Sequence, residues 1–593
     1  MRVEYDPDEP HVFAVDPERN TVTLETTGWE ETEPHRETDP LEPAAVRIDR
    51  RSHAVTERLV GPPVHAVAID AESEDRTTVT AGDTVSLDAE TVVRLSSTVR
   101  VVLRPEGPGR LERRAGETVI AFPEPTAVTV GWASRIKLPD RTVRLPRTLD
   151  GLAEYLTLSG AAATATSPDR TWPNARDHPP RLRYGDREVP GTLREGRPET
   201  NVELLVPRDG GIRTLCPLAP LAHYLGARVT VETGVEPAVV LDGRTERLGE
   251  TTRAADRAAS RLLRRVFYLD CLARSAGPYG DPLSRVGLLD ELRLDADRLY
   301  DAPLAERVRA YLDAPFETVA DDFPDWHLGV HLDPSFDRAR TLPAHLNRLS
   351  DVYTPESAAL TIPDRIEWSV EHSFARGPAG STQEEPPVVD PADRARTVGW
   401  AAPRVALGAF NSFPEALDNR ERHTAADEPL SVVVVNNAMG MFEEHQRVIE
   451  NYRERVAELP IMEVEAHSML SPNALAELFE SRSDLLHFIG HCDGGKGLRC
   501  PNREHLHTTA VDDCGAATFV LNACGSYDQG RELLRRGSVA GVVTLVTAKD
   551  RTATRVGIDW SRLMANGWSV ERGLDLARRA TDSPGNYVIV GDG

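Results

Sequence analysis

Short apolar runs alternate with segments of helical periodicity from Pro429 onward. The run Leu430–Val435 is continuous and rich in valine, which is typical of a strand buried on both faces of a sheet. Strands that alternate with helices form mostly parallel sheets with helices on both faces. We therefore predict an α/β fold with a mostly parallel sheet for residues 429–593. Its further strands are expected at 461–466, 484–490, 517–523 and 539–545, and its helices at 443–456, 472–481 and 528–536.

The 593 residues are too many for one compact core, so a multidomain protein is expected. Residues 1–150 consist of short β-branched runs separated by turn residues, which indicates a β-rich domain, a sandwich or partly open barrel, for recognition or assembly. Residues 151–245 mix helical and strand-like runs and predict an α/β subdomain, whereas residues 246–345 show helical periodicity. Residues 346–428 are expected to be a connecting segment with a flexible, proline-rich stretch.

The charge balance narrows the possible partners. Lysine and arginine total 69 and aspartate and glutamate total 94, giving a net charge of −25 at pH 7. Such a charge disfavours attraction to nucleic acid or to anionic membranes, so neither is expected as a partner. Almost all the cations are arginines, since lysine occurs only at positions 137, 496 and 549. Acid-rich, lysine-poor chains resemble the proteins of salt-loving archaea, although a GC-rich genome alone would also favour arginine codons.

The N-terminus and the cysteine content predict the compartment. Residues 1–5 lack an apolar signal region, and no apolar run approaches the length of a membrane span. Six cysteines are too few for a disulfide framework in a chain of this length. We therefore expect a soluble, cytoplasmic protein.

Two of the predicted strands are followed by reactive side chains. His491 follows the run 484–490, and Cys524 follows the run 518–523. The functional crevice of an open α/β sheet lies beyond the carboxyl ends of its strands, and we expect these two strands to be neighbours. An imidazole beside a thiol supplies a strong nucleophile near neutral pH. Gly525 lets the backbone turn there, so that amide groups can face a developing oxyanion.

Other chemistry in this stretch is less well supported by the spacing. His487 lies inside an apolar run and is expected to be a hydrogen-bonded core histidine. The cysteines lack a paired Cys-x-x-Cys spacing, so no metal site is predicted. Neither Cys492 nor Cys524 has an arginine six positions later, as phosphatase chemistry requires. The segment Gly494–Gly497 lacks the spacing of a phosphate-binding loop, so no bound nucleotide is expected.

At the two reactive motifs the sequence resembles the caspase-like cysteine proteases of the CHAT type, a group related to separases. The resemblance rests on Leu486–His491 and Leu521–Ser526, and it covers about residues 429–593. The family implies a caspase-like fold and hydrolysis of peptide bonds through an acyl-enzyme, without a cofactor. The resemblance continues through a downstream pattern of Gly530, Leu533–Leu534, Gly537 and Ala540–Val543.

The resemblance also implies roles for individual residues. It makes His491 the general base and Cys524 the nucleophile, with an oxyanion hole formed by the amide of Cys524 and one just after His491. The loop residues of this hole are Cys492 and Gly525, and Cys492 stands where related enzymes have glycine. The implied lining of the substrate pocket is Asn522, two positions before the nucleophile, and Asp493.

The implied partners are a protein or peptide substrate and a regulatory protein that acts through the N-terminal region. Two alternatives remain open. Because Cys492 replaces the glycine, the domain could be a non-catalytic, caspase-like scaffold kept for assembly. The other alternative is a protease that matures by cutting itself within residues 377–397.

Overall fold

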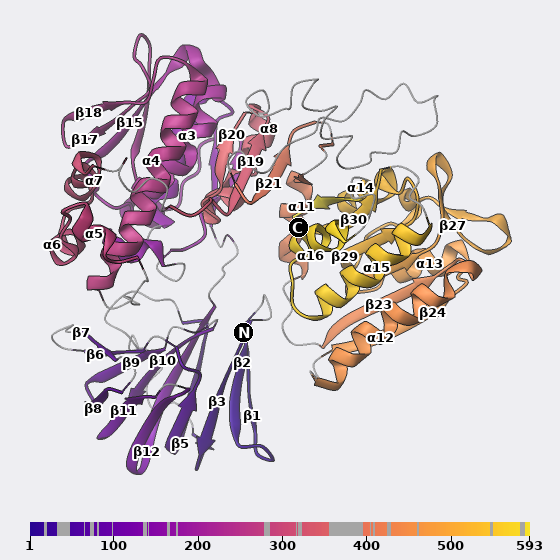
Figure 1. Cartoon of the computed structure of the whole chain (residues 1–593), viewed down its shortest axis with the longest axis horizontal. Helices are drawn as coiled ribbons and strands as arrows, with labels where there is room; N and C mark the ends of the chain where they lie inside the picture. The colour runs from indigo at the N-terminus through magenta and orange to yellow at the C-terminus, as the bar shows by residue number, and fades with distance from the viewer. Residues whose placement is uncertain are drawn as a thin grey trace.

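The chain is described here from a computed structural model (Figure 1). The proline-rich stretch 377–387 lies outside the described residues, and so does most of the segment 377–397 considered for self-cleavage. The structure describes all residues except 17–19, 33–47, 65, 72–75, 80–81, 96, 98, 115, 135–138, 140, 163–165, 173–175, 278–284, 316, 318–322, 355–394, 404, 407–408, 424–428, 459–461, 546–549, 581–586 and 593.

The first 134 residues form a β domain, drawn from indigo to purple in Figure 1. Its pairings are antiparallel, and the main sheet has the strand order β1-β2-β3-β5-β12-β10-β9-β6-β7. Alternate side chains, such as Leu24 and Trp132, are buried in its apolar interior. The strands are β1 (Arg2–Asp6), β2 (His11–Val15), β3 (Thr21–Thr27), β4 (Glu30–Glu31), β5 (Arg50–Gly61), β6 (Ala66–Asp70), β7 (Arg76–Val79), β8 (Thr84–Leu87), β9 (Thr91–Leu95), β10 (Val99–Pro105), β11 (Gly109–Arg113) and β12 (Thr118–Ser134).

Two small sheets and a group of helices follow the β domain. One sheet pairs two strands in parallel, and the other has the order β16-β15-β17-β18. The strands are β13 (Thr142–Leu145), β14 (Arg181–Tyr184), β15 (Val202–Pro207), β16 (Arg228–Glu232), β17 (Ala238–Leu241) and β18 (Arg244–Arg247). The main helices are α1 (Leu149–Ser159), α3 (Gly211–Leu225), α4 (Thr252–Ala273), α6 (Ala296–Asp301) and α7 (Leu304–Asp313).

A ten-stranded sheet runs through the rest of the chain, in the order β20-β19-β21-β22-β31-β30-β29-β25-β23-β24. The strands predicted after residue 429 are all present within a few residues of their expected limits. The structure adds β31 as the partner of β30. The strands are β19 (Leu328–Leu332), β20 (Asp351–Tyr353), β21 (Thr397–Ala401), β22 (Phe410–Asn411), β23 (Leu430–Asn436), β24 (Met462–Ser468), β25 (Ser483–Ile489), β29 (Ala516–Asn522), β30 (Ala540–Thr544) and β31 (Tyr587–Gly591).

This sheet consists of two parallel halves that run in opposite directions. The strands β24, β23, β25, β29 and β30 are parallel to one another, and so are β20, β19, β21, β22 and β31. The antiparallel pair β30–β31 joins the halves. The strands β20, β21 and β22 lie within 346–428, which we expected to be a connecting segment, so the sheet continues across the boundary drawn at residue 429.

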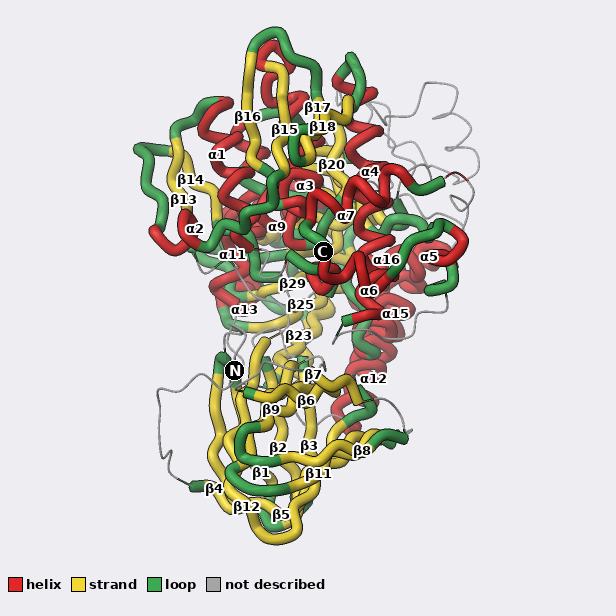
Figure 2. Tube along the Cα trace, turned by 90° about the vertical axis from the view of Figure 1, so that its left-hand side faces the viewer, coloured by secondary structure: helices red, strands yellow, loops and turns green. Residues whose placement is uncertain are grey.

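Helices cover both faces of the second half of the sheet, as the alternating pattern predicts (Figure 2). Leu485 and Val520 face one apolar cluster with α12 and α15, whereas Leu486 and Leu521 face another with α13 and α14. Side chains of residues that are adjacent within one strand thus point to opposite faces of the sheet. The helices are α11 (Pro414–Asn419), α12 (Phe442–Glu458), α13 (Pro472–Glu480), α14 (Tyr527–Arg535), α15 (Asp550–Ala565) and α16 (Val570–Arg579).

The close packing between β29 and β30 gives a test of this sheet. A Cβ atom at Gly541 would clash with the ring of Phe519, whereas one at the exposed Gly440 would meet no atom within 4 Å. We expect Gly541→Ala to cost about 1–3 kcal/mol because the core is overpacked. In a thermal melt the midpoint temperature of Gly541→Ala should fall by about 2–4 °C for each kcal/mol of lost unfolding free energy, whereas Gly440→Ala should melt like the wild type. Equal melting of both variants would contradict this packing.

Candidate functional site

The two strands that lead to His491 and Cys524 are neighbours, which confirms the expected pairing. The parallel strands β25 and β29 pair through residues up to Ile489 and Asn522, which lie opposite each other. The amide of Gly490 donates to the carbonyl oxygen of Asn522 at 3.3 Å. His491 and Cys524 each follow this last pair by two residues, so both leave the sheet at the same edge and level. Both are partly exposed.

The turn that carries Cys524 is held by hydrogen bonds to the strands β29 and β30. Gly525 has a φ angle of +67°, a conformation that suits glycine. The hydroxyl of Ser526 donates to the carbonyl oxygen of Leu521 at 3.0 Å and accepts from the amide of Thr544 at 3.1 Å. Helix α14 begins directly afterwards, at Tyr527. The nucleophile candidate therefore sits on a short, fixed link between strand and helix.

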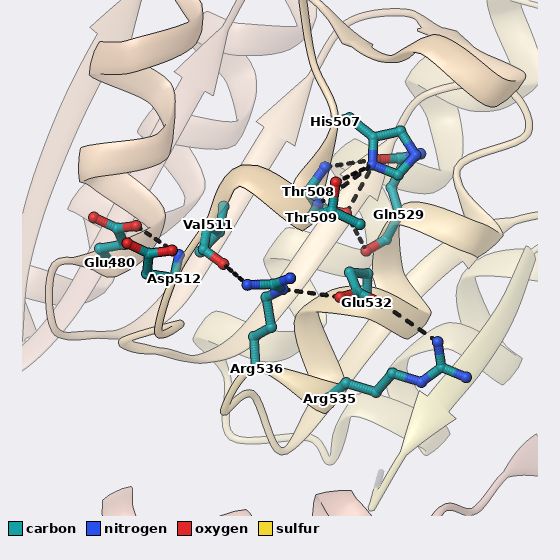
Figure 3. Close-up of polar contacts among 10 residues, drawn as sticks. All are labelled: Glu480, His507, Thr508, Thr509, Val511, Asp512, Gln529, Glu532, Arg535 and Arg536. Atoms are coloured by element: carbon teal, nitrogen blue, oxygen red, sulfur yellow. Dashed lines mark hydrogen bonds and ion pairs between the residues drawn. The ribbon is translucent and has the colours of Figure 1, made fainter.

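Helix α14 is braced by the loop that precedes β29 (Figure 3). The side-chain oxygen of Gln529 accepts from the amide of Thr508 at 2.9 Å, and the hydroxyl of Thr508 donates to the carbonyl oxygen of Gln529 at 3.0 Å. Arg536, one residue beyond the helix, donates to the carbonyl oxygen of Val511 at 2.5 Å and pairs with Glu532 at 2.9 Å. These contacts fix both ends of the helix against one loop.

Cys492 lies beside the same turn. Its side chain is 8% exposed, and its Sγ lies 3.9 Å from the carbonyl oxygen of Gly525. Burial, followed by the nearby Asp493, Cys524 and Asp528, raises the pKa of the Cys492 thiol to about 12. Cys492 therefore remains a neutral thiol at physiological pH and is a poor nucleophile.

Asp493 lies on a small three-stranded arm that leaves the sheet after His491. The arm consists of β26 (Cys492–Asp493), β27 (Gly497–Arg499) and β28 (His505–Leu506). Asp493 accepts a hydrogen bond from His505 at 2.6 Å and pairs with Arg499 at 3.1 Å. The bonds from His505 and Arg499 hold the pKa of the Asp493 carboxyl below its usual value. Asp493 therefore remains a carboxylate that ties the arm together.

Asn522 belongs to a buried polar network beneath the turn. Its side-chain amide donates to Glu444 at 2.5 Å and to the carbonyl oxygen of Ala553 at 3.1 Å. Its side-chain oxygen accepts from the hydroxyl of Tyr587 at 2.6 Å. Glu444 also accepts from Thr554 at 3.0 Å. Asn522 is only 3% exposed, so these partners occupy its polar atoms inside the protein.

Sequence reasoning missed Glu444 and Tyr587, the two partners that hold Asn522. Glu444 lies at the start of α12, where acidic residues are common on exposed helix faces, so nothing in the sequence marks it as buried. Burial raises its pKa, and bonds from Thr554 and Asn522 oppose this rise. Tyr587 lies in β31, and its contact with Asn522 depends on the pairing of that strand with β30, which no local pattern shows.

His487 is a core histidine, as its place in an apolar run predicts. It is fully buried, its ring lies 5.9 Å from that of Trp560, and Tyr452 lies within hydrogen-bonding distance at 3.4 Å. Burial lowers its pKa to about 3, so the ring stays neutral. His487 therefore serves packing and offers no second base at the edge of the sheet.

Neither a metal site nor a membrane-spanning helix is found among the described residues. In that part of the chain, no group of three or more histidine, cysteine, aspartate or glutamate side chains is arranged to hold a metal ion. The six cysteines, all of them described, form no disulfide. None of the described helices is both long and apolar enough to cross a membrane.

No protein-family model and no curated protein matches this sequence. Solved structures of cysteine proteases of the caspase clan do match. A Saccharomyces cerevisiae separase–securin complex matches with 12% identity and a TM-score of 0.25, over 34% of this chain and 16% of that chain. A second structure of that complex matches with 11% identity and a TM-score of 0.26, over 83% of this chain and 29% of that chain. The Arg-specific cysteine proteinase gingipain R matches with 10% identity and a TM-score of 0.30, over 45% of this chain and 77% of that chain.

These matches are too distant to carry an argument about the site. This chain spans less than a third of the separase chains that it matches, and all three TM-scores are below 0.5. The assignment of functional residues therefore rests on the geometry of this chain.

The buried carboxyl of Glu444 gives a pH-dependent test. Its raised pKa means that the carboxyl of Glu444 binds a proton more tightly in the folded protein than in the unfolded chain, where glutamates titrate at about pH 4.3. Wild-type stability should therefore fall as pH rises from that value through the folded pKa. Glu444→Gln has no such proton, so its melting temperature relative to wild type should increase between pH 4.5 and 7.5.

Thr554→Val is the matched control, because it removes one donor to Glu444 and keeps the carboxyl group. Since that bond lowers the pKa, its loss should extend the pH-dependent decline to higher pH. Parallel melting curves for the wild type and Glu444→Gln at every pH would show that Glu444 does not titrate as described.

Proposed function

We propose that residues 429–593 form a caspase-like cysteine endopeptidase of the CHAT type, with Cys524 as nucleophile and His491 as general base. The observation that carries this proposal is the pairing of β25 with β29, which brings both residues to one sheet edge, each two positions beyond the last strand pair. Both side chains are partly exposed, as groups that meet a substrate must be. The functional crevice of an α/β sheet lies at such an edge.

The reaction would proceed through an acyl-enzyme. His491 would take the proton of the Cys524 thiol, and the thiolate would attack the carbonyl carbon of the scissile peptide bond. The protonated imidazole would then give its proton to the leaving amine. Water would attack the thioester, with His491 again acting as base, and would release the carboxylate product and regenerate the thiol.

The backbone around the two residues supports an oxyanion hole. The amide of Arg499 donates to the carbonyl oxygen of His491 at 2.9 Å, so His491 is a hydrogen-bonded member of the β26–β27 ladder. Successive residues of an antiparallel ladder point their backbone groups to opposite sides. The amide of Cys492 therefore points away from β27, and in the proposed reaction it would donate to the developing oxyanion together with the amide of Cys524. A side chain at position 492 does not prevent this arrangement.

The substrate pocket would lie beside Cys524, with Asn522 and Asp493 at its border. The polar atoms of Asn522 are bonded to Glu444 and Tyr587, and Asp493 is bonded to His505 and Arg499. These residues would therefore shape the pocket and would not capture a charged substrate side chain directly.

The substrate would be a protein or peptide, and a regulatory protein would act through the β domain. The two separase structures contain securin, a protein partner of that enzyme. We place this protein in the cytoplasm of a salt-adapted organism, in keeping with its acid-rich, lysine-poor composition. A non-catalytic scaffold is the second candidate, and Cys492 in place of the glycine after His491 is the observation that favours it.

The enzyme and the scaffold are distinguished by labelling with a library of peptidyl vinyl sulfones, which react with activated cysteines. We expect the wild type to be labelled at Cys524 and Cys524→Ala to lose labelling completely. His491→Ala should slow labelling by about 10³-fold or more, because the thiol loses its base.

Cys492→Ala is the matched control and should be labelled like the wild type, because the pKa of the Cys492 thiol is raised to about 12. Labelling that survives in Cys524→Ala would rule out Cys524 as the nucleophile. A wild-type protein that no probe labels, while every variant melts normally, would favour the scaffold.

A further inference from the structure

A hollow of about 550 Å³ opens in the β domain beside β3, far along the chain from Cys524. One wall is the first part of β3, and another is the end of β5 with the turn that follows it. The volume falls within the range of about 300–1,000 Å³ that ligand sites occupy. The hollow is lined by Thr21, Val22, Thr23, Glu25, Val60, Gly61, Pro62, Val64, Ser97, Gly116 and Glu117.

The hollow exists because the ladder between β3 and β5 stops early. These strands pair only over Glu25–Thr27, where Glu25 lies opposite Val60. Continued by two residues, the same register would place Thr23 opposite Pro62. Proline has no N–H to donate. The carbonyl oxygen of Pro62 already accepts from the amide of Val64 at 2.8 Å and from Thr118 at 2.9 Å, so β5 cannot extend the ladder.

The backbone of Thr23 faces this gap. The backbone amide of Thr26 donates to the carbonyl oxygen of Pro10 at 2.8 Å, and the carbonyl oxygen of Asn20 accepts from the amide of Asp16 at 3.0 Å. The backbone groups of the even-numbered residues in this segment therefore face β2. Backbone groups of successive residues in an antiparallel strand point to opposite sides. The carbonyl oxygen of Thr27 accordingly accepts from Thr56 of β5 at 2.9 Å. The N–H and C=O of Thr23 therefore point into the hollow, where no strand of the described residues pairs with them.

The lining determines what kind of strand fits this edge. Val22 is buried on its inner side, Val60 and Val64 add further apolar surface, and none of the described lining residues is basic. Glu25 is exposed at the rim. Glu117 lies on the opposite side, where it pairs with Arg114 at 2.7 Å. An occupying strand is thus best matched by apolar side chains on its inner face and basic side chains on its outer face.

We propose that an extended segment of a partner protein, with alternating apolar and basic side chains, adds to β3 at this edge. About four residues of extended chain, roughly 13 Å long, would cover the uncompleted part of β3. Backbone bonds to Thr23 would supply affinity, and the valines and Glu25 would supply selectivity. This site is independent of the chemistry proposed for Cys524.

A labelled hexapeptide of alternating valine and arginine tests the site on the full-length chain by fluorescence anisotropy. We expect it to bind, and a peptide of alternating valine and glutamate to bind at least about tenfold more weakly. Thr23→Pro removes the donor that faces the hollow and leaves the bonds to β2 in place. It should weaken binding of the arginine peptide by about tenfold or more.

Thr23→Val is the matched control, because it keeps the backbone N–H and should bind like the wild type. Glu25→Gln should weaken binding of the arginine peptide, and it should not weaken binding of the glutamate peptide. Hydrogen exchange on the wild type provides a measurement that needs no variant: the Thr23 amide should exchange more slowly when the arginine peptide is bound.

Three results would overturn the proposal. They are the absence of binding by the arginine peptide, equal binding by Thr23→Pro and Thr23→Val, and an unchanged exchange rate of the Thr23 amide in the complex. A concentration-dependent dimer that Thr23→Pro abolishes would also overturn it, because a second copy of this chain would then be the occupant of the edge.

Discussion

The antiparallel pairing of β30 with β31 is the contact on which the arrangement of the large sheet depends. Five residue pairs, from Ala540–Gly591 to Thr544–Tyr587, join two parallel halves of opposite direction. Because the halves run in opposite directions, the carboxyl ends of β25 and β29 lie at one edge of the sheet, and those of β19 and β21 lie at the other. The pairing also brings Tyr587 within bonding distance of Asn522, two residues before Cys524.

The candidate site thus adjoins a polar network that is buried within the sheet. Asn522 is bonded through both ends of its amide, and Glu444 and Tyr587 come from elements on either side of it in the sequence. Polar groups buried in this way must be fully bonded, because each unpaired one is costly. A satisfied network of this kind fixes the backbone of the strand end more firmly than apolar packing alone would.

Much of the second half of the sheet could be predicted from sequence, because its information is local. A run such as Leu430–Val435 shows a buried strand by itself, and the order of strands and helices then gives a parallel sheet. The positions of His491 and Cys524 at strand ends follow from the same pattern. Whether these residues react is a separate matter of chemistry, which spacing alone does not decide.

The parts that could not be predicted depend on contacts between distant residues. The strands β20 and β22 are too short to show periodicity, and they belong to the sheet only through partners elsewhere in the chain. The burial of Glu444 depends on the packing of α12 against α15, which no local pattern shows. Likewise, the gap beside Thr23 results from Pro62, in the turn that follows β5.

The place of β31 in the sheet also bears on how this protein is made. The ribosome releases β31 after every other strand of the sheet, yet β31 lies between β22 and β30, near the middle. Until residues 587–591 have emerged, the two halves have no strand to join them, and Asn522 has no tyrosine to bond. A nascent chain therefore carries His491 and Cys524 before β31 can help to hold them in place.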